Sequence, residues 1–187
     1  MKDADVAYYP NFFGKEASDL YFKSLLNNLS WKEDTIKVFG KTYLQPRLTA
    51  FYADNTKTYK YSNIIMMPNV FDGELLKIKR SIEAKLKIEF TSCLANLYRD
   101  GKDSNGWHAD NEKELGTNPI IASVSFGAER VFRFKHRYDK ALKNKLTLEN
   151  GSLLLMKGET QHNWLHQIPK TQKPIGKRIN LTFRIIA

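Results

Sequence analysis

Residues Arg178-Ile179-Asn180-Leu181-Thr182-Phe183-Arg184-Ile185 alternate strictly between polar and apolar side chains. Successive side chains of a β-strand point to opposite faces of a sheet, so this segment is predicted to be a strand with one apolar face packed on a core. The other face carries two arginines separated by an amide and a hydroxyl. That face is either exposed to solvent, the commoner arrangement for alternating arginines, or the wall of a pocket, which suits the small polar residues better.

Other segments in the second half of the chain share this period of two. Residues 120–126 place only apolar side chains on one face, and 130–134 and 151–156 are also typical of strands. Several short strands joined by turns, with no helix between them, predict an antiparallel sandwich or jelly roll. Cys93 lies in an earlier apolar segment and is interpreted as a core residue.

The first half of the chain has a helical period instead. Residues 15–29 are predicted to form an amphipathic helix whose core stripe is Ala17, Leu20, Tyr21, Ser24, Leu25 and Leu29. A second helix is expected after Pro68, with the stripe Phe71, Leu75, Ile78, Ile82 and Leu86. Helices followed by strands predict an α+β fold in which the N-terminal helices pack on one sheet. We expect a single domain over 1–187, because no repeat or linker interrupts the chain.

Composition narrows the class of protein. A hydrophobic fraction of 42% with 12% aromatic residues excludes a disordered chain. The formal net charge of +10 indicates either a polyanionic partner, nucleic acid first, or a soluble protein that is merely basic. The one cysteine excludes a disulfide framework. Because neither a signal peptide nor a membrane span is recognisable, we expect an intracellular protein, cytoplasmic or, in a eukaryote, nuclear, with no membrane partner. We also expect a monomer.

The segment Trp107-His108-Ala109-Asp110 places a histidine and a carboxylate two residues apart. On extended backbone such positions point the same way, so both side chains can reach one ion. Two histidines and one carboxylate on one face of Fe(II) leave three positions open, as O₂ activation requires. Taken alone, this spacing is more often an exposed turn, so a second histidine from a distant segment is needed.

Three histidines remain as candidates for that second ligand. His136 lies in a stretch rich in lysine and arginine, whose charge repels a metal ion. His162 and His166 both follow the predicted strand 151–156, and a nearby glycine and proline favour a loop and a short strand there. Their spacing does not choose between them.

The polar face of the last strand suits a dicarboxylate. Arg178 and Arg184 lie about 20 Å apart along an ideal strand, and their long side chains can lean toward each other. Such a pair can hold a small dicarboxylate, one carboxylate per guanidinium. The same pocket is expected to receive an amide and a phenol from an earlier strand face, that of Asn96 and Tyr98.

Taken together, these motifs resemble the AlkB-like, iron- and 2-oxoglutarate-dependent alkylation-repair dioxygenases, from about residue 38 to the C-terminus. The segments that carry the resemblance are 96–98, 101–103, 107–110, 121–127, 164–166 and 178–184, of which the last is highly specific. The resemblance implies a double-stranded β-helix, which is a jelly-roll variant. It also implies that His166 completes the iron site with His108 and Asp110.

The resemblance extends to the residues around the iron. It implies that 2-oxoglutarate is bound by Asn96, Tyr98, Arg178, Asn180, Thr182 and Arg184. It places Glu112, with Asn111 beside it, near a base flipped out of the nucleic acid. It also places Tyr61, near Tyr59, in a stack on that base, with ordinary sheet packing as the alternative for Tyr61.

A further segment, Val38-Phe39-Gly40-Lys41 followed by Pro46-Arg47, resembles the branch of the family that acts on duplexes. In that branch an apolar finger fills the gap left by the flipped base, so Phe39 is the expected finger; packing in the core is the alternative. That branch also grips the opposite strand with a run of basic residues. Only Lys173 matches this run clearly, in Lys170-Thr171-Gln172-Lys173.

The function that the resemblance implies is oxidative demethylation of N-alkylated bases in DNA, such as 1-methyladenine or 3-methylcytosine. Fe(II), 2-oxoglutarate and O₂ would be used, and succinate, CO₂ and formaldehyde released. A base must leave the duplex for this chemistry, which accounts together for an aromatic stacker, an apolar finger and positive charge. The alternatives are the same chemistry on RNA or on a protein side chain, and a non-catalytic nucleic-acid-binding module. The complete set of ligands and arginines argues against the module.

Overall fold

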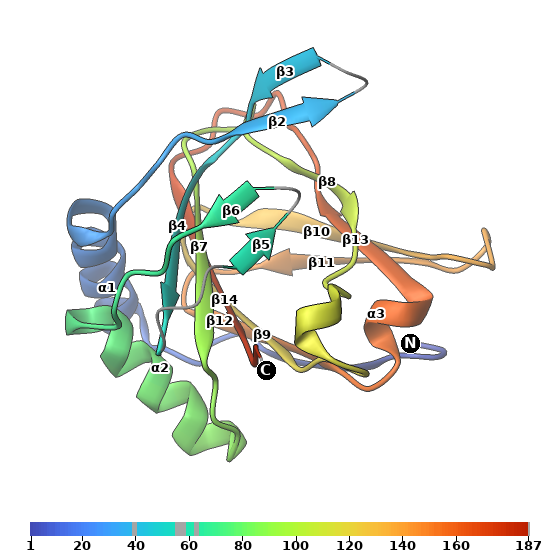
Figure 1. Cartoon of the computed structure of the whole chain (residues 1–187), viewed down its shortest axis with the longest axis horizontal. Helices are drawn as coiled ribbons and strands as arrows, with labels where there is room; N and C mark the ends of the chain where they lie inside the picture. The colour runs from blue at the N-terminus through green and yellow to red at the C-terminus, as the bar shows by residue number, and fades with distance from the viewer. Residues whose placement is uncertain (39–40, 55–58, 62–63, 187) are drawn as a thin grey trace.

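The computed structural model of the chain is built around two antiparallel β-sheets, with helices on the outside of one of them (Figure 1). It describes residues 1–38, 41–54, 59–61 and 64–186, and it describes 36–38, 41, 59–61 and 64–66 by their backbone alone. Among these residues, no helix is both long and apolar enough to cross a membrane.

The larger sheet has six strands. In spatial order they are β1 (Asp5–Tyr9), β12 (Ser152–Lys157), β9 (Ile121–Gly127), β14 (Arg178–Arg184), β7 (Ser92–Tyr98) and β4 (Leu48–Ala53). The C-terminal strand β14 lies in the middle of the sheet, paired with β9 on one side and β7 on the other. The segment with the sharpest alternation therefore occupies the most buried place in the sheet.

The smaller sheet has four strands. In spatial order they are β11 (Lys143–Leu148), β10 (Arg130–His136), β13 (Trp164–Ile168) and β8 (Asn105–His108). Two hairpins stand apart from both sheets, β2 (Thr35–Val38) with β3 (Lys41–Leu44) and β5 (Tyr59–Tyr61) with β6 (Ile64–Met66). The helices are α1 (Lys15–Asn28), α2 (Gly73–Leu86), the short α3 (Thr160–Asn163) and a 3₁₀ turn over Lys113–Leu115.

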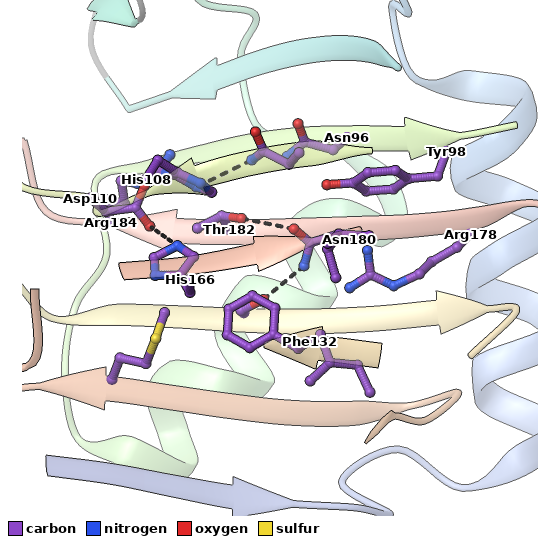
Figure 2. A pocket seen from close by; sticks show the side chains of 15 residues that line it. Asn96, Tyr98, His108, Asp110, Phe132, His166, Arg178, Asn180, Thr182 and Arg184 are labelled. Atoms are coloured by element: carbon purple, nitrogen blue, oxygen red, sulfur yellow. Dashed lines mark hydrogen bonds and ion pairs between the residues drawn. The ribbon is translucent and has the colours of Figure 1, made fainter. Parts of the chain in front are cut away.

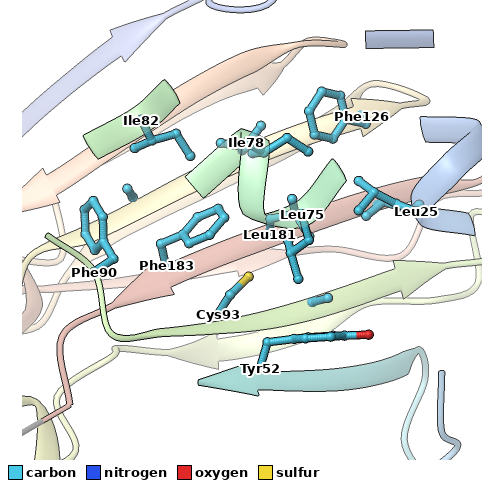
Figure 3. Close-up of a cluster of buried hydrophobic side chains, with 14 of the residues drawn as sticks. Leu25, Tyr52, Leu75, Ile78, Ile82, Phe90, Cys93, Phe126, Leu181 and Phe183 are labelled. Atoms are coloured by element: carbon cyan, nitrogen blue, oxygen red, sulfur yellow. The ribbon is translucent and has the colours of Figure 1, made fainter. Parts of the chain in front are cut away.

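The main core lies between the larger sheet and the helices α1 and α2 (Figure 3). Ile179, Leu181 and Phe183 of β14 are fully buried in it, as are Ala122, Val124 and Phe126 of β9. Burying each large side chain of this kind contributes about 1.5–3 kcal/mol. The alternate side chains of the same strands point toward the smaller sheet. One face of the larger sheet therefore packs against the helices, and the other lines the interior of the jelly roll.

Most of the predicted elements are confirmed. Both helices and the strands over 120–126, 130–134, 151–156 and 178–184 are present, and Cys93 is fully buried in β7. One member of the first helical stripe is wrong, because Leu20 is 69% exposed. The solvent-exposed alternative for the polar face of β14 is also wrong, since Arg178 is 1% exposed and Arg184 is 3% exposed.

Candidate metal centre and its pocket

The smaller sheet and the loop after β8 bring one carboxylate and two histidines together. His108 ends β8 and lies directly opposite His166 of β13 in the antiparallel register, with 4.3 Å between ring centroids. Asp110 follows two residues after His108. One ligand atom from each of these three residues lies within 4.8 Å of the others, at one end of the pocket (Figure 2). Three such atoms around a common point are the arrangement that a facial iron site needs.

The other candidate histidines lie elsewhere. The His136 ring packs against Trp164 at 5.1 Å between centroids, and its Nε2 is 3.5 Å from Oδ2 of Asp3. His162 is exposed on α3. Of the histidines left open by the sequence, the structure therefore places His166 beside His108 and Asp110.

Charge and burial keep the three ligands in the protonation state that a cation requires. Burial alone would raise the pKa of Asp110, but the charge of Arg184, aided by His166, outweighs it and lowers the pKa to about 2. Burial, followed by repulsion from His108, lowers the pKa of His166 to about 3. At neutral pH the carboxylate is therefore ionised and the imidazole of His166 is neutral, with a lone pair to offer.

A backbone contact selects the tautomer of His108. Its Nδ1 lies 2.7 Å from the carbonyl oxygen of Gly106, which can only accept, so Nδ1 carries the hydrogen. Nε2 then holds the lone pair and accepts from the amide of Asn105 at 3.2 Å. Orientation of a ligand imidazole by a carbonyl behind it is the usual arrangement in metal sites.

Asp110 is held from two sides. Nη2 of Arg184 donates to Oδ1 at 2.8 Å, and the backbone N–H of Asp110 donates to Oε1 of Gln161 at 3.0 Å. Oδ2 is left facing Nε2 of His166 at 3.9 Å. Because His166 is neutral, the contact between Oδ2 of Asp110 and Nε2 of His166 is not an ion pair. The two atoms instead face a common point as potential metal ligands.

We expect the Gln161→Met variant to bind a divalent ion about 10-fold more weakly, since loss of such supporting contacts costs about 10- to 100-fold in metal affinity. Gln161 is 0% exposed, and methionine keeps its length while removing the acceptor for Asp110. Co(II) titration followed by visible absorption measures the change. Gln172→Met, at an exposed position, is the control; equal affinities in both variants would contradict a supporting role.

The opposite end of the pocket is formed by Arg178 (Figure 2). Its Nη2 donates to Oγ of Ser125 at 2.9 Å, and its guanidinium lies over the Tyr98 ring, 5.1 Å from the centroid. Burial lowers its pKa to about 10, with Tyr98 opposing, so the cation persists at neutral pH. Within the described part of the chain, its Nε and Nη1 have no hydrogen-bond partner.

An unpaired buried cation costs several kcal/mol, so Arg178 is expected to bind an anion. The wall between it and the metal end is polar: Asn180 donates to Oγ of Ser123 at 2.7 Å, and Thr182 donates to Oδ1 of Asn180 at 3.1 Å. The apolar lining comes from Phe132, Leu148, Met156 and Ile168. A carboxylate at one end and a metal-chelating group at the other fit this donor set, as 2-oxoglutarate requires.

Two arginines differ from the sequence-based arrangement. The sequence predicted that each of the two arginines binds one carboxylate of the dicarboxylate. In the structure Arg184 is instead paired with Asp110, so of the two only Arg178 is left to bind a carboxylate of the ligand. Arg47 was placed with the nucleic-acid-binding residues, but it is 5% exposed and donates from Nε to Oδ1 of Asn96 at 2.8 Å. A buried guanidinium needs acceptors, and Arg47 finds them in the Asn96 side chain and the Ser104 carbonyl.

The residues expected to meet the substrate are placed unevenly. Asn111 and Lys173 are exposed, and Glu112 is half-buried, with its pKa raised by burial and then by the charge of Asp110. Phe39 and Gly40 lie outside the described residues. The side chains of Val38, Lys41, Tyr59 and Tyr61 lie outside them too, although their backbone belongs to the two hairpins.

Several residues of the site were not predicted. Ser123 and Ser125 had a signal, because they are the polar positions on the face of 120–126 opposite its apolar parity. Asn105 and Gln161 had none. Asn105 contacts His108 within β8 itself, and the contact of Gln161 with the Asp110 backbone depends on how a one-turn helix meets the loop after β8.

Comparison with known proteins agrees with this geometry. Residues 5–184 match the model of the 2OG-Fe(II) oxygenase superfamily. The chain is 41% identical over 190 residues to the alpha-ketoglutarate-dependent dioxygenase alkB homolog 3 of Bos taurus, covering 97% of this chain and 66% of that protein. It is 35% identical over 188 residues to the DNA oxidative demethylase ALKBH2 of Homo sapiens, covering 95% and 72%. The chain thus spans about two thirds of the length of these relatives.

Solved structures confirm the jelly-roll fold. The structure of OsALKBH1 superposes with a TM-score of 0.63 at 17% identity, over 96% of this chain and 97% of that one. A prolyl hydroxylase from Trichoplax adhaerens, in complex with a hypoxia inducible factor peptide fragment, gives a TM-score of 0.66 at 11% identity, over 97% and 83%. At these identities the likeness concerns the fold alone. The family follows from the sequence matches: the chain belongs to the 2OG-Fe(II) oxygenase superfamily, whose cofactors are Fe(II) and 2-oxoglutarate, and within it to the AlkB-like dioxygenases.

Proposed function

We propose that this chain oxidatively demethylates N-alkylated nucleobases in DNA, of the 1-methyladenine and 3-methylcytosine type. The reaction consumes O₂ and 2-oxoglutarate and releases succinate, CO₂ and formaldehyde. The observation that carries the proposal is the set of half-buried His108 with buried Asp110 and His166 in the same pocket as Arg178, whose Nε and Nη1 have no hydrogen-bond partner among the described residues. The choice of a DNA base is supported by the relative named a DNA oxidative demethylase and by the net charge of +10.

Fe(II) held by His108, Asp110 and His166 would supply the O₂ activation that couples decarboxylation of 2-oxoglutarate to hydroxylation of the methyl group. The chain's own contribution is orientation. Arg184 fixes one oxygen of Asp110, and the Gly106 carbonyl holds the Nδ1 hydrogen of His108, which leaves the Nε2 lone pair to bind the ion in place of the Asn105 amide. Positioning of this kind lowers the barrier because no group has to reorganise as the reaction proceeds.

Arg178 sets the direction of the co-substrate. With its two unpartnered nitrogens, Nε and Nη1, it binds the carboxylate far from the metal through charge-assisted bonds. The keto acid end then extends past Asn180 and Thr182 toward the metal ligands (Figure 2).

Methylated DNA and RNA oligonucleotides of the same sequence test the proposed substrate. In the presence of Fe(II), methylated single-stranded and duplex DNA should stimulate release of CO₂ from 2-oxoglutarate, and the unmethylated strands should not. Greater stimulation by methylated RNA would transfer the assignment to RNA. No stimulation by either nucleic acid would overturn the proposal and point to another substrate, such as a protein side chain.

Phe39 provides a test of action on duplexes. Its place in Val38-Phe39-Gly40-Lys41 predicts an apolar finger that offsets an unstacking cost of a few kcal/mol in duplex DNA. Phe39→Ala should therefore lower activity on a methylated duplex at least about 10-fold and spare the matching single strand. Equal loss on both with a lower melting temperature would identify Phe39 as a core residue. Unchanged activity on both would remove the main support for action on duplexes.

A further inference from the structure

The outward face of the smaller sheet carries cations in an unfavourable arrangement. In the register of β10 and β11, Arg133 lies directly opposite Lys145, and Lys135 lies directly opposite Lys143. Like charges in directly opposed positions destabilise a sheet. Within the described ranges, none of the four forms an ion pair with a carboxylate. Repulsion between these cations destabilises the fold, and no carboxylate among the residues described offsets it. Destabilising features of this kind are characteristic of functional surfaces.

An aromatic ring lies at one end of this surface. Trp107 on β8 is 39% exposed, and Nζ of Lys135 lies over its ring, 4.5 Å from the centroid. A groove of about 670 Å³ runs from Trp107 to Lys143 and Lys145 across the sheet. Because Trp107 immediately precedes His108, the groove begins on the strand that carries a metal ligand.

A second groove, of about 370 Å³, continues the surface. Arg133 lines both grooves, and Lys170 and Lys173 line the second one, together with the single carboxylate of Glu129. We call the surface formed by Trp107, Arg133, Lys135, Lys143, Lys145 and Lys173 the basic track. Its charged side chains are all cations apart from Glu129, and it has one exposed aromatic ring, Trp107, next to His108.

We propose that the basic track binds the phosphates of a single-stranded segment flanking the reacting base, with one base of that segment stacked on Trp107. This inference rests on the proposed function, which supplies the nucleic acid. Cations that follow a backbone, combined with an aromatic ring on which a base can stack, are the usual means of binding single strands without sequence preference. A base on Trp107 takes the place of Nζ of Lys135, which then binds a phosphate.

The choice of nucleic acid over an acidic protein follows from Trp107. An acidic peptide would satisfy the charges of Lys143 and Lys145 but offers no flat ring for the exposed tryptophan. Base stacking on an aromatic side chain contributes enough to change affinity about 10-fold, whereas side-chain carboxylates gain nothing from it. An abasic oligonucleotide, which keeps its phosphates but lacks bases, therefore shows whether the basic track recognises a nucleic acid or only negative charge.

The first test uses an unmethylated, labelled single-stranded DNA of about 15 nucleotides, so that binding is measured without turnover. Lys143→Ala/Lys145→Ala should bind it about 10-fold more weakly at low salt. It should also reduce the slope of log affinity against log salt by about 1.4, because each phosphate contact on a single strand contributes about 0.7. The matched control is Lys23→Ala/Arg80→Ala, which removes the same charge from exposed positions on α1 and α2. Equal affinity of the two double variants would overturn the proposal.

The second test concerns stacking. Binding of the same oligonucleotide should quench the tryptophan fluorescence of the wild-type protein, and Trp107→Leu should lose that quenching while keeping its melting temperature. An abasic oligonucleotide of equal charge should bind the wild type about 10-fold more weakly. If the abasic strand or a polyglutamate peptide binds as tightly as the normal strand, the assignment to nucleic acid is overturned.

These outcomes are separable from those of the proposed function. If Lys143→Ala/Lys145→Ala loses DNA binding while the wild-type protein releases no CO₂ with any methylated oligonucleotide, the basic track is supported and base demethylation is refuted. Normal demethylation by this variant on a long single strand at limiting concentration would refute the track alone. Turnover of a methylated trinucleotide, too short to reach β11, should be the same in the variant and the wild type.

Discussion

The His166→Ala variant should lose more than about 100-fold in Fe(II) affinity, while His162→Ala should bind Fe(II) like the wild type. His166 supplies one of three ligand atoms within 4.8 Å of one another, whereas His162 is exposed on α3. Removing a direct ligand must cost more than removing a supporting contact, which already costs about 10- to 100-fold. Anaerobic titration with Fe(II), or with Co(II) as a spectroscopic substitute, measures both variants.

A stability control is needed because His166 also packs in the interior. Its ring stacks on Phe132 with 5.1 Å between centroids, so truncation leaves a cavity. The melting temperature of each variant without metal separates misfolding from loss of a ligand, and His166→Gln keeps much of the volume without the imidazole. Normal Fe(II) binding by a folded His166 variant, with loss in His162→Ala, would reverse the ligand assignment.

Replacement of Arg178 should have the largest effect on the co-substrate. Arg178→Met is expected to raise the dissociation constant of 2-oxoglutarate by more than about 100-fold, because a charge-assisted two-donor contact to a carboxylate is lost. The same variant should be at least as stable as the wild type in the absence of ligand. An unpaired buried cation is costly, and an apolar side chain of similar volume relieves that cost.

Thermal unfolding with a redox-inert divalent ion measures both effects. At 100 times the dissociation constant, 2-oxoglutarate should stabilise the wild type by about 2.7 kcal/mol and the Arg178→Met variant hardly at all. Arg80→Met, on the exposed side of α2, is the matched control and should respond like the wild type. An unchanged ligand response in Arg178→Met would show that another group holds the distal carboxylate.

The alternation of residues 178–184 predicted which side chains pack in the core, but it left the polar face open between solvent and a pocket, and Ile185, on the apolar parity, is 38% exposed. A period of two fixes which side chains share a face, and burial of one face of a central strand leaves the other in the interior. The two helices were predicted for the corresponding reason, with Leu20 as the exception. The second histidine was decided by resemblance and not by spacing, because the pairing of β8 with β13 is a long-range contact.

The features that could not be predicted depend on contacts between residues that are far apart in the sequence. Arg184 and Arg178 are equivalent in the strand pattern, yet only Arg184 has Asp110 beside it, since the loop after β8 passes over that end of β14. Arg47 follows a proline in a segment that looks exposed, but it lies directly before β4 and is buried against Asn96 of β7. The short strands of the hairpins lack the length that makes a period recognisable.

Mass spectrometry of a methylated oligonucleotide after reaction shows whether this chain demethylates a DNA base with Fe(II) and 2-oxoglutarate. We expect the strand to lose one methylene unit, formaldehyde and succinate to form in equal amounts, and His166→Ala to yield none of these products. A wild-type protein that binds Fe(II) and 2-oxoglutarate but leaves every methylated DNA strand unchanged would contradict the proposed demethylation.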